Sequence, residues 1–137
     1  MSASAWALQK ALYAHLAADA GVLAELGDPP RIHDEAPPGA ALPHVVLGEG
    51  SARPVPGLDG GVEHEIRLLV HSRHQGRREV KRIIDVLHDA LHDAAFAVEG
   101  ASLVNIRHVF SDVFRRSDDG TYLGVARFRA VTQEESE

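Results

Sequence analysis

The most constraining feature of the sequence is a pair of alternating runs near its end, separated by an Asp-Gly turn. Residues 102–116 alternate between apolar and polar side chains, and residues 121–131 do so again. In the first run, four apolar side chains are expected to share a face: Val104, Ile106, Phe110 and Phe114. Asp-Gly between two such runs is the strongest short-range signal for a β-hairpin, and here it occurs at Asp118-Asp119-Gly120. The sequence therefore predicts a long antiparallel hairpin.

Helices are predicted in two places upstream of this hairpin. Residues 3–18 carry leucines at helical spacing and contain neither Pro nor Gly, with Trp6 and Tyr13 broadening the apolar stripe. A second short turn of helix follows at 19–26. After Gly76 the helical period returns, and an apolar stripe predicts a helix from residue 76 to about residue 93.

Strands are predicted between these helices, with a loop among them. Residues 31–35 and 43–48 read as short strands, and residues 62–73 as a long, half-buried one. Residues 51–61 hold two prolines and three glycines in eleven positions, which is typical of a flexible loop that carries function or moves. The acidic tail, residues 132–137, is expected to be disordered.

This order of elements predicts one α+β domain spanning residues 1–137. Two helices would cover one face of a mostly antiparallel sheet. A chain of 137 residues can bury one sizeable core.

Composition narrows the classes of function. The chain has no cysteine, which excludes disulfides and thiolate chemistry. Neither a signal peptide nor a membrane-spanning run is recognisable, so we expect a protein made in the bacterial cytoplasm. The formal charge of −6 argues against a protein that grips nucleic acid, because phosphate binding needs clustered Lys and Arg.

Patterns that carry chemistry are sparse. His88 and His92 stand one helical turn apart and could chelate a metal, which leaves a small metal-dependent hydrolase as an alternative function. No Glu follows His88 in a His-Glu-x-x-His pattern, and no third ligand is fixed by spacing. Ser72 can be grouped with nearby histidines and Asp112, but no Gly-x-Ser-x-Gly elbow would present its hydroxyl. We therefore predict no catalytic residue, no cofactor and no metal.

One basic cluster stands at the corner between the long strand and the second long helix. It comprises Arg73, Arg77, Arg78, Lys81 and Arg82. Arginines in the first turn of a helix lie close to the positive end of its dipole. Their presence there suggests acidic partners across an interface, such as a carboxylate of a neighbouring chain.

The order of features resembles a known protein family. Its most specific parts are Ala36-Pro-Pro-Gly39 followed by Leu42-Pro-His-Val-Val46, and the final strand Gly124-Val-Ala-Arg-Phe-Arg-Ala130. The sequence is similar, over nearly its whole length, to the tail-completion (tail terminator) proteins of long-tailed phages and of gene transfer agents. His44 and His71 depart from the family pattern, because relatives often carry an aromatic residue there.

The resemblance implies a structural function. Family members form a hexameric ring on the tail tube, stop its polymerisation and join it to the head-side connector. The implied partners are further copies of this chain, the tube protein and the connector or neck proteins, with DNA passing through the lumen without specific binding. A lumen lined with carboxylates would repel DNA and keep it sliding. Another neck or head-completion ring of the same particle is the nearest alternative.

Candidate interface residues follow from this implied role. We expect the loop at 51–61 and the hairpin tip to reach the tube or the next subunit, and exposed strand edges to join subunits by sheet extension. The predicted contacts to other subunits or to the tube are Arg53, Leu58, Glu63, Glu65, Arg73, Arg77, Arg78, Asp118 and Asp119.

Overall fold

Five strands form one sheet in the order β1-β2-β3-β5-β4, and the neighbouring strands pair antiparallel except for the two-residue β1. A computed structural model provides the coordinates, and it describes residues 3–73, 77–116 and 120–135. The strands are β1 (Ile32–His33), β2 (His44–Pro54), β3 (Gly61–His71), β4 (Ala101–Arg115) and β5 (Tyr122–Glu134). The predicted hairpin is β4–β5, and β5 also pairs with β3 along its length.

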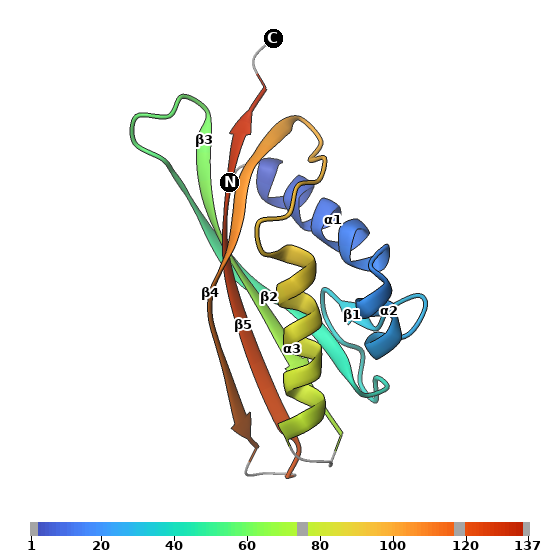
Figure 1. Cartoon of the computed structure of the whole chain (residues 1–137). Helices are drawn as coiled ribbons and strands as arrows, with labels where there is room; N and C mark the ends of the chain where they lie inside the picture. Colours follow the sequence, from blue (N-terminus) through green and yellow to red (C-terminus); the bar gives the residue numbers. More distant parts are fainter. Residues whose placement is uncertain (1–2, 74–76, 117–119, 136–137) are drawn as a thin grey trace.

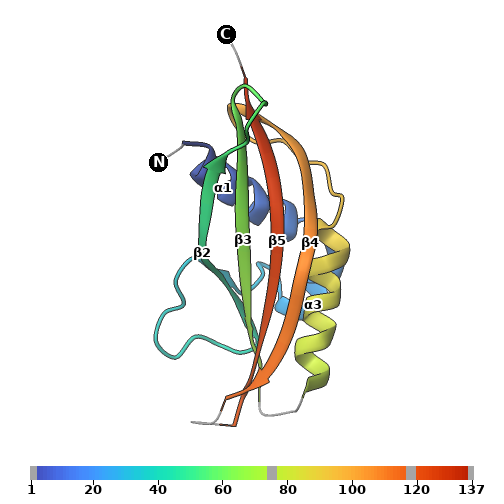
Figure 2. The ribbon, with the colours of Figure 1, turned by 90° about the vertical axis from the view of Figure 1, so that its left-hand side faces the viewer.

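The helices lie on one face of this sheet and leave the other face open (Figures 1 and 2). They are α1 (Ala3–Ala17), α2 (Ala20–Leu26) and α3 (Arg77–Leu91). Asp19 caps α2 by accepting a hydrogen bond from the Val22 N–H at 3.0 Å. The predicted α+β class is confirmed, and α2 adds a short third helix to the two long ones.

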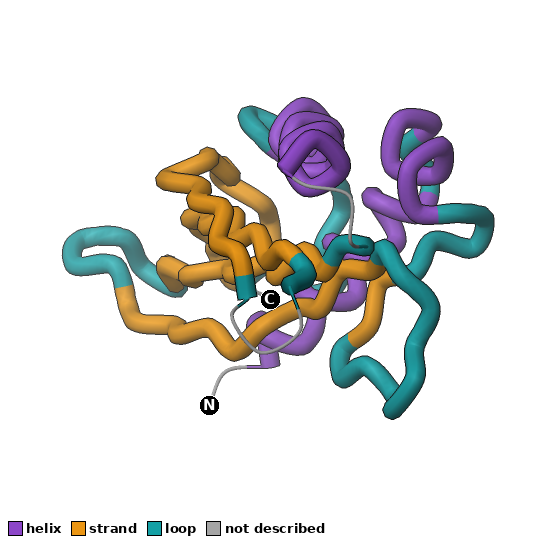
Figure 3. Tube along the Cα trace, turned by 90° about the horizontal axis from the view of Figure 1, so that it is seen from below, coloured by secondary structure: helices purple, strands orange, loops and turns teal. Residues whose placement is uncertain are grey.

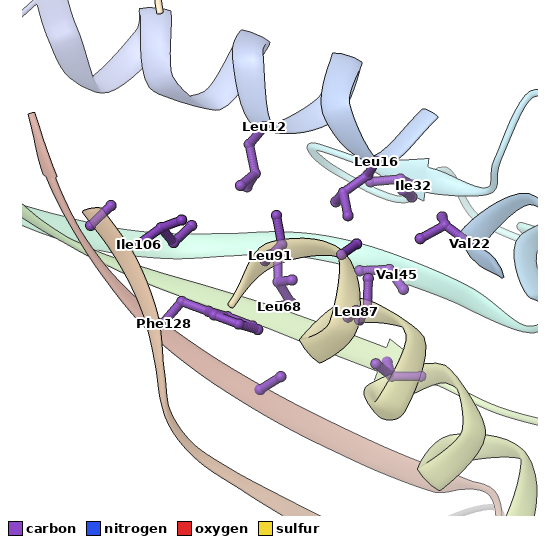
Figure 4. Packing of buried hydrophobic residues seen from close by; sticks show 14 of the residues in the cluster. Leu12, Leu16, Val22, Ile32, Val45, Leu68, Leu87, Leu91, Ile106 and Phe128 are labelled. Carbon is purple, nitrogen blue, oxygen red and sulfur yellow. The ribbon is translucent and has the colours of Figure 1, made fainter. Parts of the chain in front are cut away.

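The core fills the space between the helices and the sheet (Figure 4). Phe128 of β5 is fully buried there, among Leu68 of β3 and Leu87 and Leu91 of α3. The long, half-buried strand predicted at 62–73 is confirmed as β3, whose even-numbered residues face the helices and whose odd-numbered ones face the open side. The prediction that Trp6 broadens the apolar stripe was wrong, because its side chain is 57% exposed and lies outside the buried stripe of α1.

Two β-bulges in β4 overturn the shared face predicted for that strand. The pairing with β5 shifts between Leu103 and Asn105 and again between His108 and Phe110. Each bulge adds one residue and so reverses the alternation that follows. Of the four apolar side chains predicted to share a face, Ile106 alone is buried, while Val104, Phe110 and Phe114 are exposed.

The loop predicted at 51–61 and the tail predicted at 132–137 are both shorter than expected. Residues 51–54 belong to β2 and pair with β3, which leaves 55–60 as the connection. Pro54 is tolerated because β2 is unpaired on its other side at this point, so no partner needs a proline N–H. At the far end β5 continues to Glu134, and Thr132 is fully buried, hydrogen-bonded to the imidazole of His64 at 2.8 Å. Residues 136–137 lie outside the described part.

Candidate assembly surfaces

Three of the predicted interface residues come together on the open face of the sheet. Glu63 of β3 lies between two arginines, with Arg53 Nη2 at 2.6 Å from Oε1 and Arg129 Nε at 3.1 Å from Oε2. Glu65 pairs with Arg127 of β5, and this hydrogen bond lowers the pKa of the Glu65 carboxyl. The centre of the open face is therefore a ladder of paired charges. Sequence reasoning missed both β5 arginines, although their alternation with Phe128 was visible.

The remaining predicted interface residues lie elsewhere. Leu58 is half-buried in the turn between β2 and β3, where its side chain folds back against Gly61. Arg73, Arg77 and Arg78 are exposed at the opposite end of the sheet, where α3 begins. Asp118 and Asp119 lie outside the described residues. The interface role of all nine residues stays a prediction.

The edge strand β4 carries most of the exposed large hydrophobic side chains of the described residues. Six large hydrophobic side chains are exposed in the described chain, and four of them lie on β4: Val104, Val109, Phe110 and Phe114. β5 pairs with one side of β4, and on the other side the Ile106 carbonyl accepts a hydrogen bond from the Asp93 N–H and the His108 N–H donates to His92 Nδ1. From Val109 to Arg115 no described strand pairs with this outer side, so that stretch is the free edge of β4. We call these four side chains and this free edge the β4 ridge.

The second free edge belongs to β2. The parallel strand β1 covers only Val45 and Val46, so β2 is open from Leu47 to Pro54. A groove of about 300 Å³ runs beside this edge, between β2 and α1, with Trp6, Leu12, Leu47 and Ile66 among its lining. The two free edges stand at opposite sides of the sheet (Figure 2). Their surfaces differ, because β4 carries exposed apolar side chains and β2 borders a groove.

Three histidines meet where α3 faces β4. The rings of His88 and His92 stack at 4.9 Å, and the His108 ring lies 5.0 Å from His88. His92 Nδ1 accepts a hydrogen bond from the backbone N–H of His108 at 3.0 Å, so this nitrogen holds the strand to the helix. Burial, with His88 and His92 nearby, lowers the pKa of His108. Within the described ranges no three His, Asp or Glu side chains are arranged to hold a metal ion.

Ser72 is held as a structural hydroxyl. Its side chain is fully buried, and its Oγ bonds to the carbonyl oxygens of Tyr122 and Arg73, each at 3.0 Å. The Tyr122 N–H donates back to Oγ at 3.2 Å. These contacts join the end of β3 to the start of β5, and they leave no exposed hydroxyl for nucleophilic attack. No helix among the described residues is long and apolar enough to cross a membrane.

Comparison with solved structures gives the class of protein. The fold matches a chain of the structure titled "Virion of native gene transfer agent (GTA) particle", with a TM-score of 0.86 and 27% sequence identity. The match covers 97% of this chain and 99% of that one. The protein therefore belongs among structural, non-enzymatic virion proteins.

The family follows from the sequence itself. Residues 10–133 match the family described as Tail completion protein gp17, and the chain belongs to that family. The resemblance found in the sequence is thus confirmed. No curated protein matches the chain. A tail-completion role is the function that the family assigns, and the contact surfaces described above are the parts of the molecule that could perform it.

Proposed function

We propose that this protein forms a hexameric ring that caps the tail tube, stops its polymerisation and joins it to the head-side connector of a phage-like particle or gene transfer agent. The observation that carries the proposal is the pair of unlike free edges, β2 and β4, in a chain of the tail-completion family. When two different surfaces of one protein bind each other, copies assemble head to tail, and they close into a ring if the rotation permits. The number six comes from the family resemblance.

The β4 ridge of one copy would pack beside β2 of the next copy. Val109, Phe110 and Phe114 are apolar side chains on a free edge, and the groove beside β2 offers an apolar lining to receive such groups. The bulges limit continuous sheet extension between copies, because β4 is interrupted twice and β2 once, between Gly48 and Ser51. Side-chain packing would therefore contribute more to this contact than a backbone ladder.

Termination needs no chemistry in this proposal. A tube grows while each ring offers a face that the next ring can bind. A ring whose two faces differ would bind the tube with one face and the connector with the other. Growth then stops because the exposed face does not fit another tube ring.

Passage of DNA without specific binding would be favoured by the open face of the sheet. Arg53 and Arg129 are paired with Glu63, and Arg127 with Glu65, so these guanidinium groups already have partners. If this face lines the lumen, these contacts place three guanidinium groups against two carboxylates on its wall, and not the surplus of carboxylates that the net charge suggested. Paired arginines bind phosphate less well than free ones.

Electron microscopy of particles made without this chain tests the proposed function. Overlong or headless tails would support termination, whereas tails of normal length with intact junctions would refute it. Complementation then tests the β4 ridge. Wild type should restore closed rings at the tail ends, and Phe110→Ser with Phe114→Ser should not. Tyr13→Ser, which removes an exposed aromatic from α1, is the matched control and should complement.

A further inference from the structure

Charged side chains are sorted between the two ends of the sheet. At the end where β3 and β4 finish and α3 begins, six cations gather, and we call them the basic end: Arg73, Arg77, Arg78, Lys81, Arg82 and Arg115. Figure 3 looks onto this end, and Figure 1 shows it at the bottom. The guanidinium of Arg77 lies 5.2 Å from the ring centre of Tyr122, the first residue of β5. Three separate segments therefore build one surface, of which the sequence showed only the part around α3.

Four of these six cations have no carboxylate partner within the described residues. Arg73 pairs with Glu79 at 3.2 Å, and Arg82 pairs with Glu25 of α2 at 3.4 Å. The other four, Arg77, Arg78, Lys81 and Arg115, are exposed, and no described carboxylate lies within ion-pair distance of them. Asp118 and Asp119, which follow Arg116 in the sequence, lie outside the described part.

The position of these cations is unfavourable for the helix itself. Arg77 and Arg78 occupy the first turn of α3, where the helix dipole favours negative charge and disfavours positive charge. Without a partner nearby, these two positive charges lower the stability of α3. An acidic surface laid against the same turn would reverse the sign of that interaction.

The opposite end of the sheet is acidic. The turn before β3, the start of β4 and the end of β5 meet there, since Gln133 Nε2 bonds to the Asp59 carbonyl at 3.0 Å and the Glu135 N–H bonds to the Gly100 carbonyl at 3.1 Å. Their carboxylates are Asp59, Glu99, Glu134 and Glu135, with Lys10 paired to Glu99 at 3.3 Å. The two ends therefore suit partners of opposite charge.

We infer that the basic end docks an acidic surface of another protein of the particle, which extends the proposed function by giving the chemistry of one ring partner. A protein is favoured over nucleic acid because a groove of about 440 Å³ at this end is lined by carboxylates as well as cations: Asp85 and Asp112 stand beside Arg77 and Lys81. Phosphates would be repelled by these carboxylates, whereas a protein surface of mixed charge can match both signs. The net charge of −6 opposes nucleic acid further.

Charge reversal at two cations of α3 that have no carboxylate partner tests the inference. Labelled wild-type chain and the variant Arg78→Glu with Lys81→Glu would be titrated onto purified tails and, separately, heads from particles lacking this chain. The variant should bind at least about tenfold more weakly to one of the two, and wild-type binding should weaken with added salt. Its melting temperature should equal or exceed that of wild type, because glutamate suits the first turns of a helix. Lys10→Glu with Arg67→Glu changes the net charge equally away from the basic end, and it should bind like wild type.

Further measurements identify the partner and separate this inference from the ring. A photo-cross-linking residue at position 78 in assembled particles should attach to an acidic segment of another particle protein. A cross-link to DNA, to another copy of this chain, or unchanged binding of the reversed variant would overturn the inference. The inference would also be overturned if wild type bound a 30-base-pair DNA duplex at about 0.15 M salt and the variant Arg78→Glu with Lys81→Glu did not. If tail ends carried no ring while the charge-reversed variant still lost binding to tails or heads, that result would refute the proposed ring and leave the basic end as a docking surface.

Discussion

α3 packs directly against Gly124 of β5, and enlarging this residue should move the helix. A Cβ atom at this position would lie 2.4 Å from Val80 Cγ1 and 3.0 Å from Ile84 Cδ1. Carbon atoms in contact prefer about 3.5–4.0 Å, so Gly124→Ala would require α3 to shift outward. The backbone of Gly124 lies outside the left-handed region, and alanine brings no strain of its own there. Val80 stands less than one turn beyond Arg77, so the shift would also displace the basic end.

The expected cost comes from overpacking. Extra atoms in a packed core typically cost about 1–3 kcal/mol, whereas Gly→Ala at a position with no clash stabilises by about 0.4–1 kcal/mol through the unfolded chain. A loss of stability in Gly124→Ala would therefore indicate the close contact with Val80 and Ile84, and a gain would indicate its absence. For a chain of this size, each kcal/mol lowers the Tm by about 4 °C.

A double-mutant cycle with Val80→Ala isolates that contact. Val80 is fully buried, and removing two methyl groups should cost about 1.6 kcal/mol in lost burial, plus a cavity term. In the double variant the new methyl at 124 occupies the vacated space, so its cost should fall short of the sum by about 1 kcal/mol or more. Urea denaturation gives the free energy of unfolding of the wild type, the two single variants and the double variant. Additivity within about 0.5 kcal/mol would refute the reasoning, and Val80→Ala with the distant Ile106→Val serves as the additive control.

Three further effects are expected. Burial lowers the pKa of His44, His64 and His108, so the folded protein binds fewer protons than the unfolded chain; stability should be complete above about pH 6.5 and decline as the pH falls toward 5, which Tm measured against pH would reveal as a slope. Asp19→Ala removes the N-cap of α2 and should cost about 1 kcal/mol by urea denaturation, while Asp19→Asn should retain most of it. Glu63→Gln weakens two surface ion pairs and should cost about 1 kcal/mol or less, with a difference from wild type that shrinks as salt is added.

The sequence predicted β3 correctly because one simple pattern governed the whole strand. From His64 to Val70 every second side chain is buried or packs against the core, and the turn-and-strand signals of β4 and β5 located the hairpin equally well. Inside β4 the prediction was wrong because these β-bulges require no particular residue type, so nothing in the sequence marks their positions. Val104 and Val109 are ordinary strand residues, and their extra positions become visible only in the pairing register.

Predictions from composition were wrong where polar residues are held in strands by specific partners. Thr132 looked like the start of an acidic tail, yet its hydroxyl is bonded to His64 inside the core. Residues 51–54 looked like a loop, yet Arg53 pairs with Glu63 across the sheet. The candidate surfaces were predictable only in part for the same reason. The charged residues around α3 are neighbours in sequence, whereas Arg115 joins them only through the fold.

The strength of the β4 ridge bears on where a ring would form. Full burial of a Val or Phe side chain contributes about 1.5–3 kcal/mol. The four ridge side chains are between 42% and 51% exposed, so about half of that gain remains available to each, or about 3–6 kcal/mol for one contact between copies. Association costs several kcal/mol in lost motion, and a Kd of 1 μM corresponds to about 8 kcal/mol. We therefore expect the isolated chain to be monomeric at micromolar concentration and to assemble on tail ends, where the tube holds neighbouring copies in place. Sedimentation of the purified chain, alone and with tube protein, measures this directly. A hexamer that persists below micromolar concentration without the tube would show that the ridge is not the principal contact.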